Sequence, residues 1–305
     1  MKFSLSKYIW FDGKFVPANM AKVPVTTHAI HYGTSIFEGI RAYWDSKSLY
    51  VFRLKDHIKR FRNSGKFYNI RLNFSDKQIE NAVIDLCKKN KIKKSCYIRP
   101  FYFVGQYGIN FHVTQKAPTH TAIFAFPFGD LFNKNGITAT ISKWRKFSDM
   151  STPTQAKMGG NYLNSILATQ DAKQRGFDEA ILLDQSGNVS EAPGENIFLV
   201  KNDELVTPPL SSSALDGITR RTIITLAKDM NLKIKVQKVS KKELKLADEI
   251  FLSGTAAEIT PIIKIDKKKI GNEEVGNITK LFMATYSDIV MNKNENYSHW
   301  LTTVY

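Results

Sequence analysis

The chain has 305 residues, 43% of them hydrophobic, which is enough for two compact domains with cores of their own. Its net charge of +16 is spread along the sequence without interleaved aromatic residues, so a solvated surface explains it better than a nucleic-acid interface. Two cysteines form neither a CxxC pair nor a disulfide framework, the first residues do not resemble a signal peptide, and no apolar run approaches the ~18 residues that span a bilayer. We therefore expect a reduced, cytoplasmic protein that binds neither nucleic acid nor membrane.

The patterning of residues 1–128 predicts a small N-terminal α/β domain. Two short apolar runs in residues 8–16 flank Asp12-Gly13, which is typical of a β-hairpin. Ser75 followed by Gln78 is a capping box that begins a helix. The other elements expected in this part are strands at 49–54, 97–104 and 121–126 and a helix at 55–67.

Residues 129–137 contain two glycines and Asn-Lys-Asn, and we expect them to connect this domain to a larger one over 138–305. The larger domain mixes strands and helices without the regular alternation of a Rossmann domain, and it has no GxGxxG. The expected helices are 161–175, 219–230 and 276–291, with a short helix after 239. The expected strands are 137–144, 179–183, 196–200, 204–207, 233–239 and 249–253.

Lys157 and Glu191 have the strongest chemical implication. Lys157 precedes Gly-Gly-Asn-Tyr (159–162), a Gly-rich turn that begins a helix, and Glu191 lies in a tight loop between strands. Pyridoxal phosphate chemistry needs a lysine that forms a Schiff base and a carboxylate that keeps the pyridine nitrogen charged. The lysine alone, one among many, would simply indicate a surface position.

Four further segments resemble the branched-chain amino acid aminotransferases of the fold-type IV class. They are residues 31–41 (HYGTSIFEGIR), 97–100 (YIRP), 217–220 (GITR) and 253–261 (SGTAAEITP). The resemblance extends from about residue 8 to about residue 261, in the family's order. It implies a two-domain α+β or α/β fold of the D-amino acid aminotransferase-like type, with pyridoxal 5'-phosphate as cofactor. It also implies reversible, ping-pong amino transfer between L-leucine, L-isoleucine or L-valine and 2-oxoglutarate, in branched-chain amino acid biosynthesis.

The family's pattern also implies roles for individual residues. Lys157 would bind the cofactor aldehyde and later move the proton of the substrate α-carbon, which is acid–base work that suits a lysine. Glu191 would bond the pyridine nitrogen and Tyr162 the phenolic oxygen. Glu195 would be a second acidic residue that supports the residues in contact with the cofactor.

The phosphate group needs N–H donors and positive charge. Ile218 and Thr219 begin a helix, where free N–H groups and the helix dipole favour an anion. The resemblance adds Arg60, from a His-x-x-Arg context, and Thr255 to the phosphate contacts.

The substrate pocket must accept a branched aliphatic side chain and then glutamate. Arg99 can pair with the side-chain carboxylate of glutamate, and the turn of Thr255, Ala256 and Ala257 can offer N–H groups to the α-carboxylate. The remaining substrate residues implied are Tyr32, Phe37, Gly39, Tyr97 and Phe128.

The family supplies Tyr32 from the neighbouring subunit, so at least a homodimer is implied, and the family includes hexamers. Phe128 stands where relatives often carry tryptophan, and Leu131 stands where a tyrosine is expected. Both departures concern the specificity of the pocket rather than the cofactor chemistry.

Other functions remain as alternatives. D-amino acid aminotransferase and aminodeoxychorismate lyase have the same fold, lysine and ring acid, but they lack the combination of the 37–41 and 97–100 segments. A nucleic-acid-binding protein has only the net charge in its favour. His28 and His31 are one helical turn apart, but that stretch has no Asp, Glu or Cys to complete a metal site, so we expect none.

Overall fold

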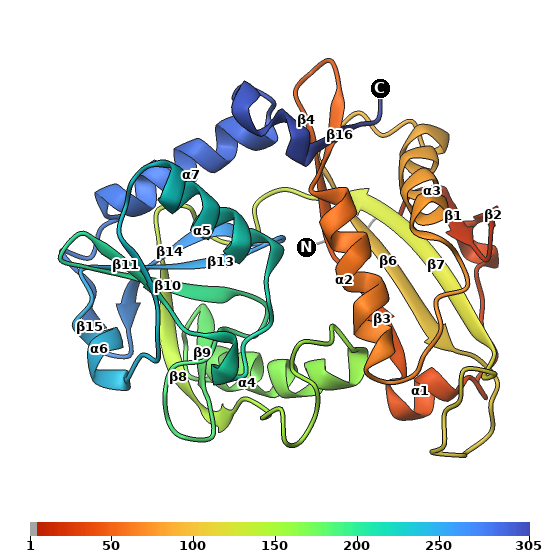
Figure 1. The fold of residues 1–305 in the computed structure, drawn as a ribbon, viewed down its shortest axis with the longest axis horizontal. Coiled ribbons are helices and arrows are strands. Elements are labelled where there is room, and N and C mark those ends of the chain that lie inside the picture. The colour runs from red at the N-terminus through yellow and green to blue at the C-terminus, as the bar shows by residue number, and fades with distance from the viewer. Residues whose placement is uncertain (1–4) are drawn as a thin grey trace. The chain divides into compact units, whose positions relative to one another are not determined.

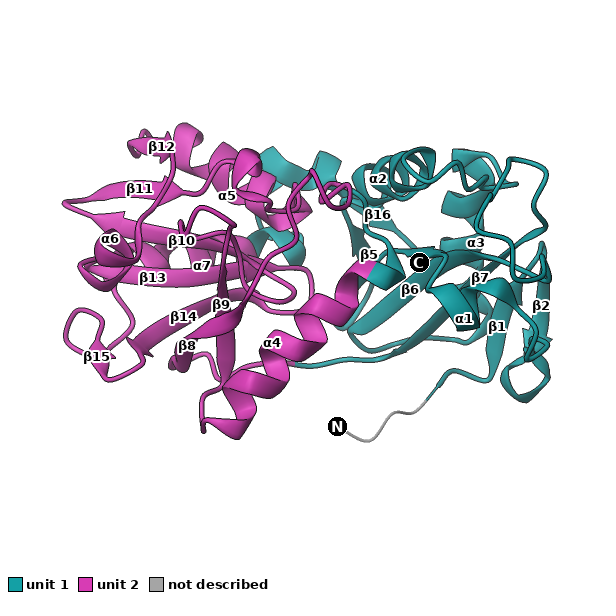
Figure 2. Cartoon of the chain, turned by 90° about the horizontal axis from the view of Figure 1, so that it is seen from below, with its two compact units in different colours: residues 1–129, 156–160, 288–305 teal, residues 130–155, 161–287 magenta. Residues whose placement is uncertain are grey.

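The structure is a computed structural model that describes residues 5–305, and the chain divides into two compact units (Figure 2). The first unit comprises residues up to 129, 156–160 and 288–305, and the second comprises 130–155 and 161–287. The domains expected from the sequence, 1–128 and 138–305, differ from these units in two short segments. Both segments belong to the first unit because they pair with its strands, as described below.

The first unit is built on one antiparallel sheet (Figure 1). Its strands are β1 (Tyr8–Phe11), β2 (Lys14–Pro17), β3 (Ser35–Phe37), β4 (Ile40–Trp44), β5 (Leu49–Phe52), β6 (Cys96–Val104), β7 (Thr119–Pro127) and β16 (Leu301–Thr303). Their order is β16-β5-β4-β6-β7-β1-β2, with β3 also paired to β6. The helices are α1 (His28–Tyr32), α2 (Leu54–Lys66) and α3 (Asp76–Lys89). Because β16 adds to β5 at one edge, the end of the chain belongs to this unit.

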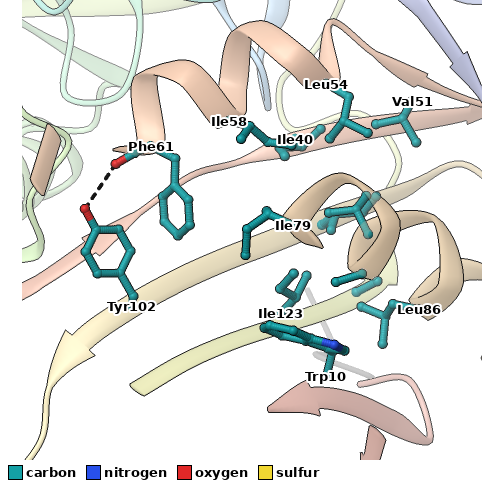
Figure 3. Close-up of a cluster of buried hydrophobic side chains, with 14 of the residues drawn as sticks. Trp10, Ile40, Val51, Leu54, Ile58, Phe61, Ile79, Leu86, Tyr102 and Ile123 are labelled. Carbon is teal, nitrogen blue, oxygen red and sulfur yellow. Dashed lines mark hydrogen bonds between the residues drawn. The ribbon is translucent and has the colours of Figure 1, made fainter. Parts of the chain in front are cut away.

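Helices α2 and α3 cover the sheet through apolar faces of helical spacing (Figure 3). Ile58 and Phe61 of α2, and Ile79 and Leu86 of α3, are at most 1% exposed. Each such side chain contributes roughly 1.5–3 kcal/mol when fully buried. The hydroxyl of Tyr102 donates to the Phe61 carbonyl at 3.2 Å, so this buried hydroxyl has a hydrogen-bond partner. The capping box that begins α3 is confirmed.

The second unit is built on a mixed sheet. Its strands are β8 (Ile137–Arg145), β9 (Glu179–Leu183), β10 (Asn196–Lys201), β11 (Glu204–Thr207), β12 (Ile234–Val236), β13 (Glu249–Gly254), β14 (Glu258–Ile265) and β15 (Lys268–Lys269). Their order is β12-β11-β10-β13-β14-β8-β9, with β15 on β14. Three neighbouring pairs are parallel, namely β8/β9, β8/β14 and β11/β12, and the others are antiparallel. A regular βα alternation is therefore absent from this sheet, as expected.

The remaining helices include α4 (Tyr162–Gln174), α5 (Ile218–Asp229), α6 (Lys241–Lys245) and α7 (Asn277–Val290). Short 3-10 helices cover Ala18–Met20, Gly159–Asn161, Leu210–Ser212 and Glu295–Trp300. Helix α4 packs on the sheet through Ala168 and Ala172, whose small side chains allow close approach to Leu182 of β9. No helix in residues 5–305 is long and apolar enough to cross a membrane.

Candidate functional site

Lys157 lies on a segment that pairs with β3 like a short extra strand. The Phe37 N–H donates to the Lys157 carbonyl at 3.1 Å, and Ile36 forms a β-bridge with Met158. From the other side, Ser64 of α2 accepts the Lys157 N–H at 3.0 Å. The backbone is thus fixed on both sides, and the Lys157 Nζ lies 4.8 Å from the centroid of the Phe37 ring.

Glycines follow Lys157 because its segment runs close to the turn after α1. The Gly160 N–H donates to the Gly33 carbonyl at 3.2 Å, and Gly33 itself has a φ of +66°. A Cβ on Gly159 would overlap the hydroxyl of Ser35, and a Cβ on Gly33 would lie 2.9 Å from the Cα of Gly160. The Gly-Gly sequence therefore has a steric cause.

Four of the side chains predicted for the substrate lie together in the first unit. The Arg99 guanidinium lies 4.8 Å from the Phe37 ring centroid and 5.3 Å from that of Tyr97, and it donates to the Tyr97 hydroxyl at 3.2 Å. The rings of Tyr97 and Phe128 are 5.3 Å apart. A Cβ on Gly39 would overlap the Tyr97 hydroxyl, so glycine is the residue that lets this tyrosine lie here.

Tyr32 has different neighbours. Its ring contacts those of His28 and Phe111, with centroids 4.6 and 5.1 Å away. His28 bonds the Thr34 hydroxyl through Nδ1 at 2.8 Å and the Asn110 carbonyl through Nε2 at 3.0 Å, so both of its ring nitrogens are used within the fold. Tyr32 therefore packs against a different set of side chains from Phe37.

A buried ionic group that the sequence analysis missed surrounds Arg60. Glu38 is completely buried and accepts from the Arg60 guanidinium at 2.6 and 2.8 Å, and its other neighbour is His57 Nδ1 at 2.8 Å. Burial alone would raise the pKa of Glu38, but Arg60 and His57 together hold it well below its ordinary value. Burial also lowers the pKa of His57, which makes it a neutral donor to the carboxylate. Arg60, predicted to bind phosphate, thus already commits two of its N–H groups.

Glu191, the predicted ring acid, is held by three donors in the second unit. Its Oε1 lies 2.6 Å from the Nζ of Lys146, just after β8. Its Oε2 accepts from the Asn196 side chain at 3.2 Å and from the Leu215 N–H at 2.9 Å. Glu191 is 5% exposed, and this donor set suits the ionised carboxylate. The sequence analysis did not identify Lys146, because no motif in the neighbouring sequence distinguishes it from the other lysines.

The predicted phosphate contacts begin at α5. The helix starts at Ile218, and its N-cap residue, Gly217, has no side chain that could accept from the first N–H groups. Thr255, Ala256 and Ala257 form the three-residue turn between β13 and β14.

Tyr162 is the first residue of α4 and is half-buried. Glu195 is 7% exposed and accepts the Gly194 N–H at 3.2 Å. The predicted residues therefore form two internally ordered groups: one around Lys157 and Arg99 in the first unit, and one around Glu191 and the start of α5 in the second.

Comparison with known proteins identifies the family of the chain. The amino-transferase class IV family matches residues 35–265. The chain belongs to this family, and within it to the branched-chain-amino-acid aminotransferases. The Salmonella typhimurium enzyme of that name is 42% identical over 301 residues, which cover 97% of each chain. A probable branched-chain-amino-acid aminotransferase of Aquifex aeolicus is 40% identical, covering 98% of this chain and 97% of its own.

Solved structures of this family have the same fold. The branched-chain aminotransferase of Thermoproteus uzoniensis with norvaline superposes with a TM-score of 0.95 at 41% identity, over 98% of this chain and 100% of that one. A branched-chain amino acid aminotransferase complexed with N-(5'-phosphopyridoxyl)-L-glutamate has a TM-score of 0.95 at 38% identity, covering 98% and 99%. The expected fold class is confirmed.

Proposed function

We propose that the chain is a pyridoxal 5'-phosphate-dependent aminotransferase that interconverts L-leucine, L-isoleucine and L-valine with their 2-oxo acids, using glutamate and 2-oxoglutarate as the second pair. The observation that carries the proposal is the Lys157 amine beside the Phe37 ring, which also contacts Arg99. A lysine amine, an aromatic ring and a guanidinium group that could bind a carboxylate are thus in one place. D-amino acid transfer and the lyase reaction are not favoured, because relatives that match nearly the full chain carry the branched-chain name.

Features of the second unit support binding of this cofactor. Glu191 is a buried, hydrogen-bonded carboxylate of the kind that faces a pyridinium N–H, and α5 begins without a side-chain cap. Among the described residues, the buried hydroxyls of Ser190, Ser212 and Ser253 have no hydrogen-bond partner. Buried polar groups normally have partners, so these hydroxyls are consistent with a polar ligand in this unit.

Each residue would then have one task. When bound, pyridoxal phosphate supplies an aldehyde for the amino group and a ring that withdraws electrons from the α-carbon. Lys157 would link to the cofactor and afterwards carry the α-proton. Glu191 would keep a proton at the ring nitrogen, while Tyr162 would hydrogen-bond the phenolic oxygen and Glu195 would support this end. Ile218, Thr219, Thr255 and Arg60 would hold the phosphate.

The substrate side chain would bind among the aromatic rings. Phe37, Tyr97 and Phe128 would form the walls for a branched aliphatic group, and Gly39 would make room for Tyr97. Arg99 would pair with glutamate when the second substrate arrives. The turn at residues 255–257 would bind the α-carboxylate.

We further propose that Tyr32 acts in a homodimer. Three exposed apolar side chains are close to it: Val25 at 81% and Ile30 at 59% in the preceding sequence, and Phe111 at 80%, whose ring contacts Tyr32. Exposed apolar groups of this kind mark interaction surfaces. Light scattering is expected to give a dimer or a multiple of it, and a monomer at working concentration would contradict this part.

The half-reactions test the activity directly. The cofactor-loaded protein is mixed with L-leucine alone, and the visible absorbance of the lysine-linked cofactor is followed. The band is expected to fall and to recover when 2-oxoglutarate is added. A band that resists L-leucine but falls with D-alanine would reassign the substrate class.

A further inference from the structure

Residues 214–216 join the ring acid to the start of α5. The Leu215 N–H donates to Glu191 Oε2 at 2.9 Å, and the Leu215 carbonyl accepts from the Asn196 side chain at 2.8 Å. The same Asn196 amide also donates to Glu191 Oε2 at 3.2 Å. Two residues further along the chain, Gly217 is the N-cap of α5. One asparagine thus bonds both the acid and the loop that leads into the helix.

Gln155 holds the same loop from its other side. Its side-chain amide donates to the Ala214 carbonyl at 2.6 Å, and its carbonyl oxygen accepts the Asp216 N–H at 3.1 Å. Three consecutive loop residues are therefore bonded to side chains. Gln155 also lies only two residues before Lys157 in the sequence.

The contacts leave the loop little freedom. A Cβ on Gly217 would overlap Oδ1 of Asn196, so the asparagine packs directly against the helix N-cap. Both amide side chains are neutral, and they set geometry without changing the charge of the site. An anion bound at a helix N-terminus depends on fixed N–H directions, and a loop that has to be ordered on binding weakens that binding.

We propose that Gln155 and Asn196 are positioning residues that fix the separation between Glu191 and the first turn of α5, and thereby set how much the phosphate group contributes to cofactor binding. The inference rests on the proposed function, since it requires the cofactor to bind Glu191 through its ring nitrogen and the first turn of α5 through its phosphate group. Neither amide is assigned a contact with the cofactor. Gln155 acts through the loop alone, whereas Asn196 acts through the loop and Glu191.

The test compares two probes that differ only in the phosphate group. Apo-protein is titrated with pyridoxal 5'-phosphate and with pyridoxal, and each dissociation constant is read from the visible band. The dissociation constant of pyridoxal divided by that of pyridoxal 5'-phosphate measures how much the phosphate group contributes to binding. In Gln155→Ala and Asn196→Ala this ratio is expected to fall about tenfold, the effect of one or two neutral hydrogen bonds. Asn196→Ala should also weaken pyridoxal itself, because Glu191 loses a donor.

Asn90→Ala is the matched control. Asn90 also bonds main-chain groups, donating to the carbonyls of Tyr8 and Leu86 at 3.0 Å and accepting the Tyr8 N–H at 2.9 Å, but it lies in the first unit. It should reduce thermal stability and leave the ratio unchanged. Gln155 is half-buried, so Gln155→Ala carries the test if Asn196→Ala fails to fold.

The outcomes separate the two proposals. If the wild type gives no visible band with either probe, the proposed cofactor chemistry is wrong. If the wild type binds both and the Gln155→Ala ratio stays within about twofold of the wild-type value, below the loss expected for one hydrogen bond, the positioning role is wrong. A ratio that falls equally in Asn90→Ala would also overturn it, because the effect would then be general destabilisation.

Discussion

Arg60 and Glu38 form a bidentate ion pair in the interior of the first unit, with the guanidinium 2.6 and 2.8 Å from the carboxylate oxygens. Glu38 has no exposed surface and Arg60 has 11% of its side chain exposed. The pair is electrically neutral. If Arg60 contacts a phosphate, it therefore contributes directed N–H groups more than net charge.

Glu38→Gln is expected to destabilise the apo-protein by about 3 kcal/mol, because it leaves the buried charge of Arg60 without its counter-ion. Urea unfolding measures the loss. The double variant Glu38→Leu/Arg60→Met removes both charges and should recover most of the stability. A double variant as unstable as Glu38→Gln would show that packing, not charge, is the cause.

Glu179 on β9 is 6% exposed, and burial, with Asp178 nearby, raises its pKa from 4.5 to about 7. A carboxyl with a raised pKa favours the folded state below its unfolded pKa, and that stability is lost as the pH rises through the folded value. Glu179→Gln does not titrate and keeps an acceptor for the Ala180 N–H. It should be more stable than the wild type by roughly 2 kcal/mol near pH 8 and about equal near pH 4. A difference independent of pH would contradict the assignment.

Lys146 and Glu191 are expected to be strongly coupled, because both are largely buried, with 14% and 6% of their side chains exposed. A double-mutant cycle of Lys146→Met and Glu191→Gln should give a coupling of about 2 kcal/mol in apo-protein unfolding. Lys201 and Asp248 are the matched pair at the surface, 2.8 Å apart but about half exposed. Their coupling should stay below about 1 kcal/mol. Equal couplings would mean that burial does not strengthen the Lys146 pair.

Arg99→Met should separate the two substrates. Loss of a charged hydrogen-bond partner is expected to raise the KM for 2-oxoglutarate about 10- to 100-fold, while the half-reaction with L-leucine changes less than about threefold. Arg175, whose side chain is 43% exposed, provides the control variant Arg175→Met. Equal effects on both substrates would place Arg99 outside carboxylate recognition.

Regular elements were predictable where a local pattern repeats. The helices α2, α3 and α5 and the strands β6 to β11 lie within a few residues of their expected positions, because apolar spacing and caps determine them. Strands β3, β4 and β14 were not predicted as strands. Their residues belong to the motif segments, in which glycines and polar residues interrupt the alternation that marks a strand.

Motifs in the sequence were enough to select Lys157 and Arg99 as candidate site residues, and their roles stay predictions. Contacts between residues that lie far apart in the sequence were not predictable. The Glu38–Arg60 pair joins residues 22 positions apart, and Gln155 bonds a loop about 60 positions away. Single polar residues such as Lys146 give no local signal, and the fold alone brings them to Glu191.

We propose that Lys157 carries the cofactor, and chemical trapping tests this most directly. Borohydride reduction of the holoenzyme fixes the lysine–cofactor link, and peptide mapping by mass spectrometry then locates it. We expect one phosphopyridoxyl group, on the peptide that contains Lys157. A label on another lysine, or none on a protein that shows the visible band, would contradict it.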